Sequence, residues 1–159
     1  MKSYADQVKA EHSYNIGNVN ARVGMFREAL SFYDEAIALD DSNPMYYNNR
    51  ASALKRIGRL QDAIKQYEEI VQKFPDYGKA FLSISSTCIE TGDYQGAISS
   101  YRRFLSAYQK GHFTFNPVFG GVNQSMPGEN FLGTALLTSI SYLSEGQQKL
   151  AIQAFQEAQ

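Results

Sequence analysis

PMYYNNRASALKRIGRLQDAIKQYEEIVQKFPDY, residues 44–77, predicts one complete helix–turn–helix unit, and its pattern recurs on both sides of it. A small residue, a glycine, an alanine and a tyrosine each return at intervals of 34 residues. These sets are Gly17, Ala51 and Ser85; Gly24, Gly58 and Gly92; Ala29, Ala63 and Ala97; and Tyr33, Tyr67 and Tyr101. An internal repeat of this period predicts a stack of helical hairpins.

The recurring residues each have a physical role in the 44–77 unit. Gly58 is placed to end the first helix, because a left-handed backbone costs least at glycine. Ala51 and Ala63 are small, as two antiparallel helices require where they approach closely. Pro75 stops the second helix. Between these positions an apolar seam runs at helical spacing, formed by Leu54, Leu60, Ile64, Tyr67, Ile70 and Val71.

A fourth set of repeat residues follows after a longer interval. Ser139, Gly146, Ala151 and Phe155 keep the internal spacing but lie 54 residues after the third set, so 54 − 34 = 20 residues are inserted, at about 111–130. The insertion is rich in apolar side chains and has one formal charge, Glu129, which predicts packing against other residues. Two interpretations stay open: a cover over the core between copies three and four, or a lid on a binding groove.

The pattern also predicts where the helices begin and end. Pairs are expected near 10–23 and 26–39, 44–57 and 60–74, 78–91 and 94–109, and 129–144 and 147–158. Ser3, followed three residues later by Asp6, resembles a capping box with aspartate in place of glutamate. The first helix is therefore expected to begin well before the first repeat.

The period, the order of small residue, glycine, alanine and aromatic residue, and the proline near the end of the unit resemble the tetratricopeptide repeat family. The resemblance covers roughly 10–111 and 130–159. It implies an all-α fold, a right-handed superhelical solenoid of four repeats at about 10–43, 44–77, 78–111 and 132–159, in one domain spanning 1–159. Ser13 and Asp41 depart from the family's usual bulky residue and proline, in a terminal copy where departures are expected.

Composition and charge exclude several classes of function. The 159 residues carry 15 basic and 16 acidic side chains, for a net charge of −1 and a pI near 6.1. The basic excess that binding to nucleic acid or an anionic membrane requires is missing. No apolar run approaches the roughly 20 residues of a membrane span, and the first residues have no apolar signal core. One cysteine excludes an intrachain disulfide framework, so a cytoplasmic protein is expected.

No set of residues predicts a chemical site. Cys88 is interpreted as a small buried hydrophobe, because no histidine, lysine or acid is placed by sequence to activate it. His12 and His112 are 100 residues apart, with no paired ligand at metal spacing. We therefore expect no catalytic residue, no metal and no cofactor.

The resemblance implies that the first helix of every pair lines a concave groove. Aligning the copies on their glycines predicts groove residues that grade from amide-rich and basic to apolar. The candidates are Tyr14, Asn15, Asn18, Arg22, Asn48, Asn49, Ser52, Arg56, Lys79, Ser83, Leu136 and Ile140. Such a surface suits an extended peptide or a helix with one acidic or polar end and one apolar end.

Some members of the family hold the C-terminal carboxylate of a chaperone in a clamp of two lysines, two asparagines and one arginine. Asn18, Asn49 and Lys79 match that set, whereas Tyr14 and Ser83 stand where a lysine and the arginine are expected. Two of the three cationic partners are therefore missing. Because carboxylate recognition depends on charge-assisted hydrogen bonds, the sequence argues against a working clamp of this kind.

Two functions from different classes remain. The first is a non-catalytic interaction module, a scaffold or adaptor that binds a peptide or helix of a partner protein in its groove. The second is an assembly element that self-associates or stacks on further repeats through the chain's end, where Leu150, Ile152 and Phe155 are spread over more than one helix face. A protein or peptide partner is expected in both cases.

Overall fold

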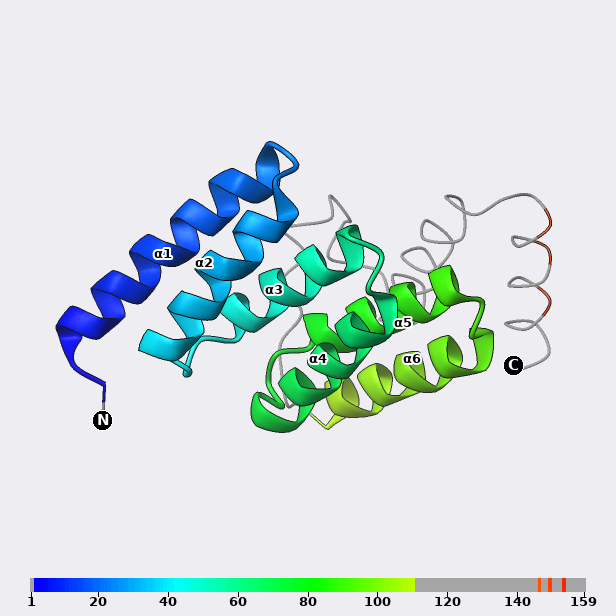
Figure 1. Cartoon of the computed structure of the whole chain (residues 1–159). Coiled ribbons are helices and arrows are strands. Elements are labelled where there is room, and N and C mark those ends of the chain that lie inside the picture. The colour runs from blue at the N-terminus through cyan, green and yellow to red at the C-terminus, as the bar shows by residue number, and fades with distance from the viewer. Residues whose placement is uncertain (1, 111–145, 147–148, 150–152, 154–159) are drawn as a thin grey trace, which may run out of the picture. The chain divides into compact units, whose positions relative to one another are not determined.

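The computed structural model describes residues 2–110 and the single positions 146, 149 and 153. Within residues 2–110 it contains helices and no strand. The helices are α1 (Tyr4–Arg22), α2 (Phe26–Leu39), α3 (Pro44–Arg56), α4 (Leu60–Lys73), α5 (Lys79–Thr91) and α6 (Tyr94–Gln109). Consecutive helices pair as α1–α2, α3–α4 and α5–α6 (Figure 1), so the predicted all-helical hairpins are confirmed here. The predicted insertion at 111–130 and most of the fourth repeat at 132–159 lie outside the described residues.

The chain divides into two compact units. Met1–Phe74 holds α1 to α4, in which α3 packs on α2 as well as on α4. Pro75–Gln159 is the second unit, and its described helices are α5 and α6. The single domain at 1–159 stays a prediction.

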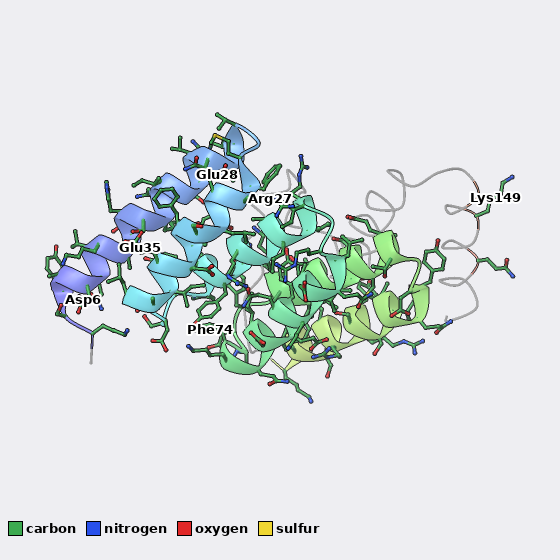
Figure 2. All side chains as sticks on the ribbon, in the orientation of Figure 1. Asp6, Arg27, Glu28, Glu35, Phe74 and Lys149 are labelled. Carbon is green, nitrogen blue, oxygen red and sulfur yellow. The ribbon has the colours of Figure 1, made fainter. Side chains whose placement is uncertain are left out.

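The capping box predicted at the start of the chain is confirmed. The Ser3 hydroxyl accepts a hydrogen bond from the Asp6 N–H at 3.1 Å, and the Asp6 carboxylate accepts one from the Ser3 N–H at 3.2 Å. The hydrogen bonds from Ser3 hold the pKa of Asp6 below its ordinary value. Figure 2 shows Asp6 on the first turn of α1, which begins at Tyr4, ahead of the first repeat.

The three repeated glycines end the first helix of each pair. Gly24, Gly58 and Gly92 have φ values of +85°, +85° and +79°, in the left-handed region. After α3, the Gly58 N–H donates to the Lys55 carbonyl at 3.0 Å and the Arg59 N–H to the Leu54 carbonyl at 2.9 Å. These bonds satisfy carbonyl groups that the helix end leaves without partners. The predicted role of Gly58 is confirmed.

Gly58→Val is expected to lower the free energy of unfolding by about 2 kcal/mol, because a branched residue is strained at positive φ. Nothing lies within 4 Å of a Cβ built at this position, so the cost comes from the backbone alone. Gly58→Asn is the matched control, since asparagine tolerates the left-handed region better. Urea unfolding should rank glycine above asparagine and asparagine above valine. Equal stability of the two variants would contradict this explanation.

The core of the first unit lies between α1, α2 and α3, with alanines at the closest approaches. Ala10, Ala36 and Tyr46 form one buried cluster, and Ala29, Tyr33 and Ala53 form another. The ring of Tyr14 packs against both clusters. Small side chains allow the helices to pack closely, and the aromatic rings fill the remaining space.

Two predicted core alanines and Cys88 are buried. Ala51 and Ala63 are fully buried in the α3–α4 pair. Cys88 is buried in the second unit, as its interpretation as a small hydrophobe requires. Asp41, which departs from the family pattern, accepts a hydrogen bond from the Lys73 ammonium at 3.1 Å at the end of α4.

Candidate functional site

A pocket of about 430 Å³ opens in the first unit between α1, α2 and α3. Three helices line it: α1 and α3 supply the walls, and α2 supplies two aromatic rings. The lining residues are Tyr14, Asn18, Ala21, Arg22, Phe26, Tyr33, Asn49, Ser52 and Ala53. Five of the predicted groove residues are among them: Tyr14, Asn18, Arg22, Asn49 and Ser52.

Two asparagine amides connect the walls of this pocket. The Asn18 carbonyl oxygen Oδ1 accepts hydrogen bonds from the Asn49 amide at 2.8 Å and from the Tyr33 hydroxyl at 2.9 Å. The same Asn49 amide donates to the Tyr14 hydroxyl at 2.9 Å. Within the described part of the chain, the Asn18 NH₂ group donates to no acceptor, so both of its N–H bonds are available to a ligand.

The Tyr33 hydroxyl keeps its proton at neutral pH. Burial raises the pKa of Tyr33 above its ordinary value, and the neighbouring Tyr14 adds to this effect, while hydrogen bonding with Asn49 acts in the opposite direction. The protonated phenol donates to Asn18 and fixes the direction of that amide. The orientation of the Asn18 NH₂ group is therefore set by α2 as well as by α3.

Gly17 makes this arrangement possible. A Cβ built on Gly17 would lie 2.6 Å from the Tyr33 ring atom Cε1, closer than packed atoms come. The ring of Tyr33 crosses the α1 backbone at this point and reaches Asn18. Tyr14 packs beside it, with ring centroids 5.9 Å apart, and also packs on Tyr46 at 4.9 Å. The small residue predicted at position 17 thus serves the pocket as well as the helix crossing.

One end of the pocket is basic. Arg22 follows Asn18 by one helical turn on α1, and Arg56 follows Ser52 by one turn on α3. The guanidinium carbon of Arg56 lies 5.0 Å from the centroid of the Phe26 ring, which lines the pocket. Both arginines are exposed.

The other predicted groove residues lie elsewhere. The prediction for Asn48 needs correction: the residue is only 5% exposed, so it lies in the interior and offers a ligand little surface. Asn15 is exposed on α1 but does not line the pocket. Lys79 is exposed and Ser83 half-buried on α5, in the second unit. Leu136 and Ile140 lie outside the described residues.

Besides Ala53, sequence reasoning missed two aromatic lining residues, Phe26 and Tyr33. Both belong to the second helix of the first pair, which the register assigns to the side away from the groove. A signal for Tyr33 was present, because a phenol at a core position needs a hydrogen-bond partner. For Phe26 no signal in the sequence separates a pocket ring from a core ring.

Two searches of the described residues bear on other kinds of site. Among residues 2–110, 146, 149 and 153, no group of three histidine, cysteine, aspartate or glutamate side chains could hold a metal ion. No helix in that part of the chain is long and apolar enough to cross a membrane.

Comparison with known proteins identifies relatives of the chain. Residues 48–112 match the family model described as tetratricopeptide repeat. The chain is 38% identical over 96 residues to the TPR repeat-containing thioredoxin TTL4 of Arabidopsis thaliana, covering 60% of this chain and 14% of the relative. It is 33% identical over 102 residues to the Hsp70-Hsp90 organizing protein of Triticum aestivum, covering 64% of this chain and 17% of the relative. The chain thus spans a small part of the length of these relatives.

A solved structure shares the fold. The first TPR of Spaghetti (RPAP3), bound to the HSP90 peptide SRMEEVD, superposes with a TM-score of 0.60 at 22% identity. The match covers 81% of this chain and 91% of that one. At this identity the likeness shows that the two chains share a helical repeat fold.

Proposed function

We propose that this chain, whose residues 48–112 match the tetratricopeptide repeat model, is a non-catalytic protein-interaction module, a scaffold or adaptor that binds a segment of a partner protein in the pocket between α1 and α3. The pocket is of the size that small ligands and peptide side chains occupy. Hydrogen-bond donors in its lining are supplied by Asn18, Ser52 and Arg22. A peptide, whose backbone carbonyls are acceptors, is the complementary ligand.

The single observation that carries the proposal is the fixed Asn18 amide. Asn18 lines the pocket and its oxygen is held by Asn49 and Tyr33, so the direction of its NH₂ group is set before any ligand arrives. A donor held in place in this way costs little entropy when it binds an acceptor. Asn49 also joins α3 to Tyr14, so the two walls are held together at the level of this donor.

The relatives favour a peptide as the ligand. One protein with this fold was solved with the peptide SRMEEVD, and a relative of higher identity is named an Hsp70-Hsp90 organizing protein. The position of the first clamp lysine is Tyr14 here, and its hydroxyl is engaged with Asn49. A free carboxylate therefore finds an amide and a phenol at this point in place of a cation, which argues against the family's clamp in its usual form.

The proposal is tested by selecting peptides from an array of random heptapeptides with the intact chain. Ser52→Phe places a ring in the pocket and removes no hydrogen bond that the structure shows, so we expect at least a tenfold loss of affinity for the selected peptides. Gln72→Ala, on the exposed face of α4, is the matched control and should bind like the original chain. Circular dichroism melting checks that both variants fold.

Two results would contradict the proposal. One is an array on which no heptapeptide binds the intact chain. The other is a set of peptides that bind the Ser52→Phe variant as tightly as the original, which would place the binding surface elsewhere. The peptide SRMEEVD, with a free and with an amidated C-terminus, adds a test of the clamp: equal affinity for both forms is expected if Tyr14 has replaced the lysine.

The second function considered, self-association or stacking on further repeats, stays a prediction. It depends on Leu150, Ile152 and Phe155, which lie outside the described residues. A cytoplasmic location likewise stays a prediction.

A further inference from the structure

We infer that the pocket selects peptides with an acidic side chain two positions from the residue whose acceptor binds Asn18. Arg22 and Arg56 bind this acidic side chain beside the ring of Phe26. The inference rests on the proposed function, since it assigns a sequence preference to the same pocket. It concerns the basic end of the pocket, one helical turn beyond the amide network.

The two arginines occupy equivalent places in successive repeats, because 22 + 34 = 56. Arg22 lies on the last turn of α1 and Arg56 on the last turn of α3. Arg22 lines the pocket directly, and Arg56 lies over Phe26, which also lines it. Both arginines therefore lie at the pocket, Arg22 in its lining and Arg56 over a ring that lines it.

The charge at this end of the pocket is not compensated within the described residues. No aspartate or glutamate lines the pocket, and neither Arg22 nor Arg56 forms an ion pair there. Other arginines of the same unit differ: Arg50 pairs with Asp34, and Arg59 pairs with Asp62 at 2.7 Å. An anion is the complement of two such groups placed at one end of a cleft.

The chemistry of the site favours a carboxylate on a side chain. A guanidinium stacked over an aromatic ring is attracted to the face of the ring and leaves its N–H edge free for two parallel hydrogen bonds to an acid. Phe26 supplies an apolar surface for the methylene groups of a glutamate. Because a solvent-exposed pair of charges binds weakly, one arginine alone would contribute little, and the inference uses both.

The distance along the helices sets the spacing in the peptide. Four residues separate Asn18 from Arg22, a rise of about 6 Å along α1. An extended peptide advances about 3.3 Å per residue and returns to the same face every second residue, about 6.6 Å. A peptide that gives one acceptor to Asn18 therefore brings the side chain two positions away to Arg22 and Arg56.

A structural role for these arginines leads to a different expectation. Cations near the C-terminal end of a helix are favourable for the helix itself, and both arginines are in that position. If the arginines only stabilised their helices, removing their charge would change the stability of the chain and leave its peptide preference unchanged. The test therefore measures both quantities.

The experiment compares the intact chain with the Arg22→Gln/Arg56→Gln double variant on the same array of random heptapeptides. We expect the peptides selected by the original chain to be enriched several-fold in aspartate or glutamate at one position. That position should lie two residues from the peptide residue whose acceptor binds Asn18. The double variant should select peptides without this enrichment and melt at the same temperature. Matched peptides that differ by one Glu-to-Gln change should then differ about tenfold in affinity for the original chain and not for the double variant.

The outcomes separate the inference from the proposed function. If both chains select peptides with the same acidic content, and Ser52→Phe still abolishes binding, the inference is wrong and the proposed function stands. If the original chain binds matched glutamate and glutamine peptides equally, the inference is also wrong. If phosphoserine binds better than glutamate at the selected position, the site prefers phosphate and the carboxylate assignment is overturned. If no peptide binds, both proposals fall.

Discussion

Gly17→Val is expected to lower the free energy of unfolding of the first unit by about 3 kcal/mol, because it forces extra atoms into a fully packed crossing of α1 and α2. A Cβ at this position would lie 2.6 Å from Cε1 and 2.8 Å from Cδ1 of the Tyr33 ring, and 3.3 Å from Cβ of Phe32. Tyr33 has no room to retreat, since it is only 2% exposed and its hydroxyl is bonded to Asn18.

The measurement is urea unfolding followed by circular dichroism. Gln7→Val is the matched control, because it places the same branched residue on an exposed turn of α1. A smaller side chain at position 33 should relieve the strain. The loss of unfolding free energy in the Gly17→Val/Tyr33→Leu double variant should therefore be less than the sum of the two single losses. Strict additivity, or an equal loss in the control, would show that Gly17 and Tyr33 do not meet.

The fold was predictable from the sequence because its determinants are local and repeated. Gly58 has open space around it and a positive φ, so its role depends only on its own backbone. Ser3 and Asp6 cap α1 across three residues. The repeat supplies the glycine signal three times, and a local signal that recurs at a fixed interval can be recognised with little error.

The pocket was predictable only in part, because its chemistry depends on contacts between helices. Asn48 and Asn49 are neighbours in the sequence and differ by about 100° around the helix, so a register accurate to one residue is needed to separate them. In the structure Asn49 bonds to Asn18 and Tyr14, while Asn48 is buried. The sequence alone therefore did not separate the asparagine that lines the pocket from the one that is buried.

Tyr14 shows a second limit of sequence reasoning. From the sequence, it was a clamp position that had lost its positive charge. In the structure its ring packs on Tyr33 and Tyr46, and its hydroxyl accepts the hydrogen bond from Asn49. A residue at a position where other family members have a binding group can have a different role. Only its contacts in the structure show what that role is.

Ala63→Leu is the second change for which a large effect is expected, a loss of about 3 kcal/mol in the free energy of unfolding. Ala63 is fully buried in the α3–α4 pair, as is Ala51. The equivalent alanines of the other two pairs, Ala29 and Ala97, are also fully buried. A position that stays alanine in all three pairs and has no exposed surface in any of them leaves no volume for three additional carbon atoms.

The control for this prediction is Ala5→Leu, which makes the same change at an exposed site on α1 and should alter stability by less than about 0.5 kcal/mol. Leucine and alanine have similar helix propensities, so the comparison isolates packing. Because α3 carries Asn49 and Ser52 into the pocket, a displaced α3–α4 pair should also weaken binding of the selected heptapeptides. A stable Ala63→Leu variant with unchanged peptide affinity would show that the α3–α4 pair has space at its crossing, contrary to the structure.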